Sequence, residues 1–234
     1  MEEHKYMQPH LSAYLRGRIM QGPDPKLHRE LTEKQLADLT EEEMQVLIDY
    51  GTAQGIKLYH FKSKEDLPRV RAVLGALRSI QPKELLDVGS GRGVFLYPFM
   101  RDFPFVPVTS VDLLPKHIET LQYMRLGGME NITMSAVADI CTLSEPAESY
   151  DAVTMLEVLE HIPNAEAAVR NAVRMARRFV ILSVPSHPDD NPEHIHLFTK
   201  DMLAEMFTSA GCKKLNFSGV NGHTILIAGK QENR

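Results

Sequence analysis

The sequence predicts an α/β fold: a mostly parallel sheet of seven strands with helices on both faces, preceded by a helical N-terminal extension. From Lys83 onward, short apolar runs alternate with stretches of helical periodicity, the pattern of right-handed βαβ units. The first run ends in a loop with glycine at alternate positions, Gly89 to Gly93, which is typical of a tight turn between a buried strand and a helix. Asn221-Gly222 between the last two runs predicts a β-hairpin that closes the sheet.

Length, charge and cysteine content limit the function classes. The 234 residues, 43% of them hydrophobic, suffice for one large domain or a domain with an added segment. We expect a soluble cytoplasmic protein, because no long uncharged apolar run is present and the first residues do not resemble a signal peptide. Cys141 and Cys212 lack metal-type spacing, which favours reduced thiols. The net charge of −5 does not favour a nucleic-acid partner.

The first 80 residues are predicted to form a helical N-terminal extension. Residues 1–30 are expected to be a loosely ordered arm with a short helix at about 11–19, since Pro23 and Pro25 interrupt any longer helix. Thr32 with Gln35, and Thr40 with Glu43, have the spacing of helix-capping boxes.

A further helix is predicted to open at Ser63 and Asp66. Its apolar positions form one stripe, and Pro68 is compatible with the helix only in its first turn. The members of the stripe are Leu67, Val70, Leu74 and Leu77. The domain boundaries that we predict are therefore 1–80 for the extension and 81–234 for the α/β domain.

Each element of the α/β domain follows from its local pattern. The predicted strands are 84–88, 107–112, 132–137, 151–156, 179–184, 213–220 and 223–228. The predicted helices are about 93–101, 115–126, 164–174 and 200–209, with Asn164 as an N-cap. Pro98 inside the first of these helices is expected to kink or shorten it.

An acidic residue follows the second predicted strand. Asp112 lies 19 residues after Gly93, close to the spacing at which a carboxylate accepts hydrogen bonds from the hydroxyls of a ribose. The loop itself reads GxGxG, with Val94 where a dinucleotide-binding loop places its last glycine, and this fits poorly with NAD.

The loop KELLDVGSGRG with the acidic strand end PVTSVD resembles motif I of the class I S-adenosylmethionine-dependent methyltransferases, of the methyltransferase type 11/12-like kind. The resemblance covers roughly residues 80–230. It implies a Rossmann-like sheet of order 3-2-1-4-5-7-6 with the last strand antiparallel, and S-adenosyl-L-methionine as cofactor. In such enzymes an N-terminal extension often lids the pocket, so Tyr59, His60 and Phe61 are candidate pocket residues, with packing of the extension as the alternative.

The resemblance also implies cofactor-binding residues. Asp139 would contact the adenine amino group and Ile140 the adenine face, while Asp87 would orient the loop amides or receive the methionine ammonium. The full set is Asp87, Gly89, Ser90, Gly91, Gly93, Asp112, Leu113, Asp139, Ile140 and Glu157.

The segment MLEVLEHIP, residues 155–163, resembles the family's motif at the end of strand four. Glu157, Glu160 and His161 have spacing i, i+3 and i+4, and His194 and His196 follow about 33 residues later. A similar set holds a divalent metal in RNA 3′-terminal ribose 2′-O-methyltransferases, so these five residues are alternative metal ligands. A metal-free lining of the substrate or cofactor site is favoured over metal binding, and a structural role is the third alternative.

His161, His194 and His196 are also the candidate catalytic bases, needed when the acceptor must lose a proton. Three functions stay open. The favoured one is a methyltransferase acting on a small-molecule acceptor. The others are a metal-dependent RNA methyltransferase and a non-catalytic module that binds the cofactor or a protein. We expect no membrane partner, and we expect the protein to be a monomer or a homodimer.

Overall fold

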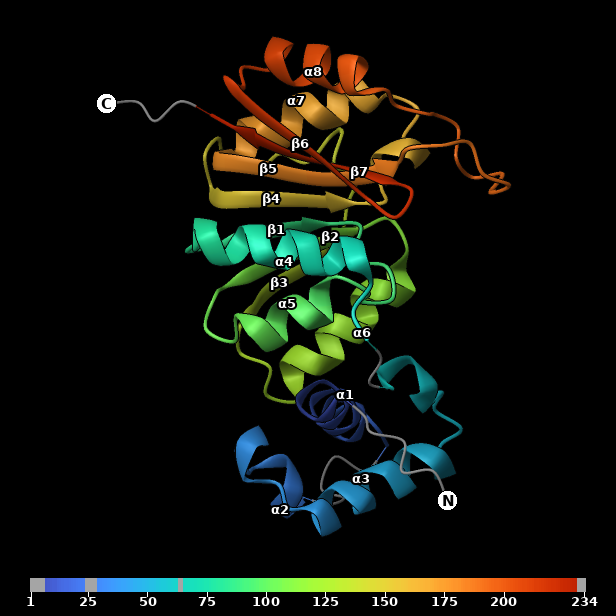
Figure 1. Cartoon of the computed structure of the whole chain (residues 1–234). Coiled ribbons are helices and arrows are strands. Elements are labelled where there is room, and N and C mark those ends of the chain that lie inside the picture. The colour runs from blue at the N-terminus through green and yellow to red at the C-terminus, as the bar shows by residue number, and fades with distance from the viewer. Residues whose placement is uncertain (1–6, 24–28, 63–64, 231–234) are drawn as a thin grey trace. The chain divides into compact units, whose positions relative to one another are not determined.

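The computed structural model describes residues 7–23, 29–62 and 65–230, and within them it contains a seven-stranded sheet of order β3-β2-β1-β4-β5-β7-β6 (Figure 1). This order confirms the predicted one. The strands are β1 (Leu85–Val88), β2 (Val108–Asp112), β3 (Ile132–Val137), β4 (Tyr150–Leu156), β5 (Ala176–Pro185), β6 (Lys214–Val220) and β7 (His223–Gly229). The helices are α1 (Gln8–Met20), α2 (Arg29–Thr32), α3 (Glu41–Ala53), α4 (Pro68–Ile80), α5 (Leu96–Asp102), α6 (Pro115–Leu126), α7 (Ala165–Met175) and α8 (Lys200–Ser209). Short 3-10 turns are η1 (Leu36–Asp38), η2 (Leu58–Phe61) and η3 (Leu159–His161).

The direction of the strands decides which residues meet at each edge of the sheet. β1 pairs in parallel with β2 and β4, and β4 pairs in parallel with β5. β7 is antiparallel to β6, as predicted from the hairpin residues Asn221 and Gly222, which have φ of 42° and 82°. It is also antiparallel to β5, as the family resemblance implied. The start of β7 therefore lies at the edge where the parallel strands end, since His223 pairs with Pro185.

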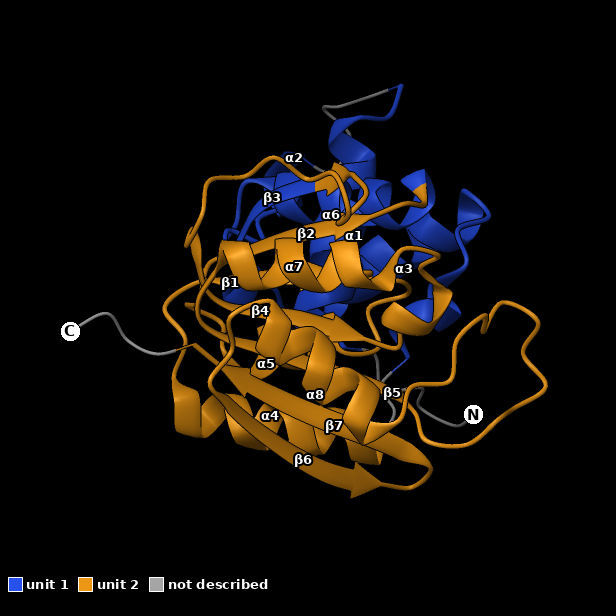
Figure 2. Cartoon of the chain, turned by 90° about the horizontal axis from the view of Figure 1, so that it is seen from above, with its two compact units in different colours: residues 1–65, 115–135 blue, residues 66–114, 136–234 orange. Residues whose placement is uncertain are grey.

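The chain consists of two compact units, each with most of its contacts within itself, and Figure 2 colours them separately. Unit 1 contains residues 1–65 and 115–135, and unit 2 contains residues 66–114 and 136–234. In unit 2, α7 and α8 bury their apolar faces against one face of the sheet, with Val153 and Leu182 in that core. The stripe of α4 is buried through Val70, Leu74 and Leu77, whereas Leu67 is exposed.

Unit 1 is built around the crossing of α1 and α6. A Cβ atom on Gly17 would lie 1.9 Å from the carbonyl oxygen of Tyr123, and one on Gly127 would lie 1.8 Å from that of Ala13. The two helices are therefore in direct backbone contact at these glycines. Within the described residues, no helix has both the length and the apolar character that crossing a bilayer requires.

Local details correct some of the expectations for the N-terminal part. The short helix predicted at about 11–19 is present as the longer α1, but the expected loose order of its surroundings is wrong for residues 8–20, because Leu11, Leu15 and Ile19 have helical spacing and are buried along α1. Thr32 does not cap a helix with Gln35; it ends α2, and its hydroxyl donates to the carbonyl of Arg29. The capping box of Thr40 at the start of α3 is confirmed.

Two helix starts also differ from the predicted positions. α5 begins at Leu96 and not near Gly93, because Gly93 has φ of 78°, outside the right-handed helical region. Pro98 consequently lies in the first turn, where a proline removes no helical hydrogen bond. α4 begins at Pro68, and the proposed cap Ser63 lies outside the described residues.

Candidate active site

The glycine loop follows β1 at the edge where the parallel strands end. Gly89, Gly91 and Gly93 all have positive φ, of 73°, 53° and 78°. A Cβ atom on Gly89 would lie 2.4 Å from a methyl carbon of Val158, so the segment after β4 packs directly on the loop. Residues with a side chain at this position would meet both a steric clash and an unfavourable backbone conformation.

Asp112, at the end of β2, connects the loop to the sheet. One carboxylate oxygen accepts from the backbone N–H of Gly91 at 2.8 Å, and the other accepts from the N–H of Leu114 at 2.8 Å. The carboxylate is thereby fixed beside the glycine loop, as the spacing of the two motifs predicts. Leu113 next to it is 63% exposed, so an apolar side chain is available to a ligand at this place.

Two buried polar side chains lie in the loop or just before it. The hydroxyl of Ser90 is buried and has no hydrogen-bond partner within the described part of the chain. Such groups are uncommon, because an unpaired buried donor costs free energy, and a bound polar ligand would remove this cost. Asp87 accepts a 2.8 Å hydrogen bond from the hydroxyl of Thr154 on β4. Burial raises the pKa of Asp87 to about 7, and the nearby charge of Asp112 adds to the increase.

Asp139 and Ile140 follow β3. The Asp139 carboxylate accepts from the N–H of Cys141 at 2.8 Å and lies exposed, whereas the Ile140 side chain is buried in the core. The N–H of Ala138 donates to the carbonyl of Asp112 at 3.2 Å, so the segments after β2 and β3 adjoin. This brings Asp139 to the edge of the sheet that carries the glycine loop.

Glu157, directly after β4, has an unusual backbone conformation and three partners. Its φ is 56°, and its carboxylate accepts from the Ser183 hydroxyl at 2.6 Å. The other oxygen lies 2.9 Å from Nε2 of His223, and Nε of Arg69 lies 3.8 Å from the first. The predicted residue is therefore held by side chains from β5, β7 and α4. These partners were not predicted, although the hairpin signal at Asn221-Gly222 could have placed His223 at this edge.

A second group of side chains lies in η3 and in the loop after β5. One potential ligand atom each of Glu160, His161 and His194 can be chosen so that all lie within 4.8 Å of one another. Nε2 of His194 is 4.0 Å from a carboxylate oxygen of Glu160. Burial raises the pKa of Glu160 to about 8, with the charges of Glu157 and Asp189 adding to the effect.

Of the five alternative metal ligands, only Glu160, His161 and His194 lie close to one another. Glu157 binds Ser183 and His223, and Nε2 of His196 faces the carbonyl of Ile162 at 3.1 Å. Asp189, not predicted, contacts Nδ1 of His194 at 2.8 Å. Its position in the loop after β5 was visible in the sequence, but no spacing rule relates it to His194.

The residues beside the glycine loop fit a nucleoside cofactor with a charged tail. The glycines allow close approach of the backbone, Asp112 supplies a carboxylate, and Ser90 supplies an unpartnered hydroxyl. Carboxyl ends of parallel strands are the usual location of ligands in open α/β sheets. The arrangement can hold a ligand between this loop and the acidic groups of Asp87 and Asp139.

The chain is similar to known proteins in sequence and in fold. A family model described as a methyltransferase domain matches residues 20–216. The ubiquinone biosynthesis O-methyltransferase of Paracidovorax citrulli is 30% identical over 105 residues, which are 44% of this chain and 43% of that protein. The matched segment thus spans less than half of the length of this curated relative.

Solved structures share the fold at low sequence identity. The [4+2]-cyclase SpnF has a TM-score of 0.60 and 16% identity, over 69% of this chain and 81% of that one. The magnesium protoporphyrin IX methyltransferase of Synechocystis PCC 6803, solved with bound SAH, has a TM-score of 0.54 and 15% identity, over 93% of this chain and 98% of that one. At this level of identity the likeness concerns the fold alone.

Proposed function

The chain belongs to the class I S-adenosylmethionine-dependent methyltransferases, and from this premise we propose that it transfers the methyl group of S-adenosyl-L-methionine to a small-molecule acceptor. The observation that carries the proposal is the link between Asp112 and the N–H of Gly91, which fixes a carboxylate beside the glycine loop. A carboxylate at this place suits the hydroxyls of a ribose.

We assign the cofactor contacts as follows. S-adenosylmethionine, when bound, supplies a methyl carbon on a positively charged sulfur that leaves readily. The backbone of Gly89, Gly91 and Gly93 admits the cofactor, and Ser90 offers its hydroxyl. Asp112 would accept hydrogen bonds from the ribose hydroxyls, and Asp139 would accept one from the adenine amino group. Asp87 would provide the negative charge opposite the ammonium group of the cofactor.

The acceptor side is assigned to the loops after β4 and β5. An in-line displacement needs chiefly that the acceptor is positioned close to the methyl carbon, because the leaving group is already activated. A base is required when the acceptor is a hydroxyl, and its proton must then pass to a side chain or to water. His161 and His194, which lie together beside Glu160, are our candidates, whereas Nε2 of His196 is bound to a carbonyl.

A small acceptor is supported by the curated relative, which is named a ubiquinone biosynthesis O-methyltransferase, and by the chain's net charge of −5. We propose the cytoplasm as the place of action, in keeping with the two free cysteines, Cys141 and Cys212.

Calorimetric titration with S-adenosylmethionine tests the cofactor assignment. We expect binding by the wild type and a loss of at least about tenfold in affinity in Asp112→Ala, because a charge-assisted hydrogen-bond acceptor is removed. Asp201→Asn, an exposed change in the first turn of α8, is the control and should bind as the wild type does. Equal affinity in Asp112→Ala would contradict the assignment.

Turnover is tested separately, by following formation of S-adenosylhomocysteine with hydroxyl, amine and thiol acceptors. Formation that depends on the acceptor supports methyl transfer. Tight cofactor binding without turnover of any acceptor class would favour a cofactor-binding module, a role compatible with the fold since the similar SpnF is a cyclase.

A further inference from the structure

Glu160 is a buried acidic side chain to which no described residue donates a hydrogen bond. Its exposed fraction is 0%, and neither side-chain oxygen has a hydrogen-bond partner among the residues that the structure describes. Removing a carboxylate from water is costly unless a cation or several donors replace the water. A cation bound here would provide the compensation that the surrounding residues do not.

Two imidazoles face this carboxylate. His161 and His194 lie with ring centroids 4.8 Å apart, and each contributes a nitrogen to the group whose ligand atoms all lie within 4.8 Å of one another. Carboxylate and imidazole together form the donor set of divalent transition metals, and two histidines with one glutamate occur in catalytic zinc sites.

The outer hydrogen bonds fix the tautomer of both histidines. Nδ1 of His161 lies 2.9 Å from the carbonyl of Glu193, and Nδ1 of His194 lies 2.8 Å from the carboxylate of Asp189. Both partners are acceptors, so Nδ1 carries the proton in each ring and the lone pair is on Nε2. Metal-binding histidines are usually oriented in this way, by a carbonyl or a carboxylate on the other nitrogen.

The backbone holds the two segments together. The N–H groups of Ile195 and His196 donate to the carbonyl of Glu160, at 3.0 and 3.3 Å, and the N–H of His194 donates to the carbonyl of Asn191 at 3.1 Å. The loop after β5 is thereby fastened to the turn that carries Glu160 and His161. Ligands on a fixed backbone lose little conformational entropy on binding.

We propose that Glu160, His161 and His194 form a binding site for a divalent transition-metal ion, with Zn²⁺ as the ion best matched to the donors, and that Asp189 orients His194. Glu157 and His196 are outside this site, since other partners hold their side chains. Zinc bonds of about 2.0–2.1 Å require the ligand atoms to approach one another by on the order of 1 Å.

Three protein ligands leave a coordination position for a further oxygen. Resting on the proposed function, we assign this position to a hydroxyl of the methyl acceptor, whose proton would pass to water when its oxygen is bound. In a metal-loaded site His161 and His194 would therefore act as ligands in place of bases. This part can fail while metal binding stands, and metal binding can be tested without cofactor or acceptor.

Titration of chelator-treated protein with ZnCl₂ tests the site. We expect about one equivalent to bind and Zn²⁺ to raise the melting temperature of the wild type. Glu160→Gln and His194→Gln should each weaken binding by at least about tenfold, and the thermal shift should disappear. His196→Gln, in the same loop but outside the site, is the matched control and should bind Zn²⁺ as the wild type does.

A second pair of variants tests the role of Asp189, which contacts Nδ1 of His194. Asp189→Asn should weaken Zn²⁺ binding about 10–100-fold, whereas Asp190→Asn, its exposed neighbour, should not change it. Both residues lie near the surface, so these variants carry the test if the change at buried Glu160 prevents folding. Absence of Zn²⁺ binding by the wild type, or binding unchanged in both His194→Gln and Asp189→Asn, would overturn the proposal.

Discussion

At the scale of single residues, Asp87 shows how a buried acid makes stability depend on pH. Its pKa in the folded protein is about 7, raised by burial, against about 3.9 in an unfolded chain. The folded state therefore binds the proton more tightly, and this contribution to stability is complete below pH 4 and is lost as the pH rises towards 7.

Replacement of Asp87 by asparagine should remove this dependence. Asparagine still accepts the hydrogen bond of Thr154 but carries no charge. The free energy of unfolding of Asp87→Asn, relative to the wild type, should increase by about 2–3 kcal/mol between pH 5 and pH 8, at about 1.4 kcal/mol per pH unit up to the pKa. Urea unfolding of the cofactor-free proteins measures it, and an equal difference at both pH values would contradict the assignment.

Some residues of the candidate site could be predicted from the sequence, and others could not. The loop glycines and Asp112 were predictable because their positions are fixed by a strand, a turn and the next strand, all close in sequence. The grouping of Glu160, His161 and His194 was not, because five candidates had suitable chemistry. Only the backbone bonds from the loop after β5 to Glu160 decide which histidine faces the carboxylate.

At the scale of elements, the strands and most helix limits were predictable from local patterns. β2, α6, α7 and α8 are close to their expected ranges because proline, asparagine or glycine marks their ends. The length and burial of α1 were underestimated, because α1 is buried by α6, a helix distant in sequence. Composition alone cannot reveal such a partner.

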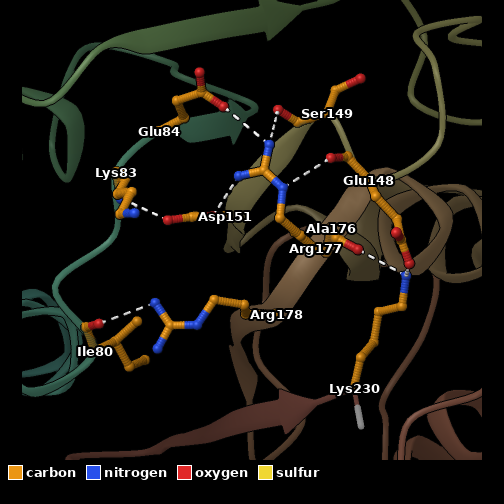
Figure 3. A network of polar contacts seen from close by, with 10 residues as sticks. All are labelled: Ile80, Lys83, Glu84, Glu148, Ser149, Asp151, Ala176, Arg177, Arg178 and Lys230. Atoms are coloured by element: carbon orange, nitrogen blue, oxygen red, sulfur yellow. Dashed lines mark hydrogen bonds and ion pairs between the residues drawn. The ribbon is translucent and has the colours of Figure 1, made fainter. Parts of the chain in front are cut away.

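The amino ends of β1, β4 and β5 are joined by the polar network of Figure 3. Arg177 binds the carboxylate of Asp151, contacts Glu84 at 3.3 Å, and donates to the carbonyls of Glu148 and Ser149, each at 3.2 Å. The network lies at the edge of the sheet opposite the glycine loop. It therefore concerns the stability of the sheet and not ligand binding.

Arg177→Ala should lower the free energy of unfolding by about 1–3 kcal/mol, because it leaves the Asp151 side chain, which is 5% exposed, without its cation. The affinity for the cofactor should stay unchanged. Arg170→Ala is the matched control: its pair with Glu166 is exposed on both sides, so the loss should be below about 0.5 kcal/mol. Chemical denaturation measures both, and equal losses would contradict the role of the network.

At the scale of the whole molecule, the crossing of α1 and α6 suggests where unit 1 is most sensitive to substitution. Gly127→Ala would place a methyl carbon 1.8 Å from the carbonyl oxygen of Ala13, so the helices must separate. We expect a loss of about 2–4 kcal/mol, slightly above the usual cost of overpacking because the obstacle is backbone.

Hydrogen exchange locates the effect. Amides of α1 and α6 should exchange faster in Gly127→Ala, while those of β1, β4 and β5 in unit 2 keep their protection. Gly75→Ala in α4 is the control with opposite sign, since no atom lies within 4 Å of the added carbon and alanine favours a helix by about 1 kcal/mol. Faster exchange throughout both units would contradict local opening.

The antiparallel direction of β7 has a consequence for protein synthesis. During translation the glycine loop leaves the ribosome before β4 and Glu157, and His223 emerges only with the last strand of the sheet. A nascent chain can therefore pair β1, β2 and β4 and still have the Glu157 carboxylate exposed to water. The contact between Glu157 and His223 therefore forms only after β7 has been made, so a chain released before β7 would have the glycine loop but not this contact.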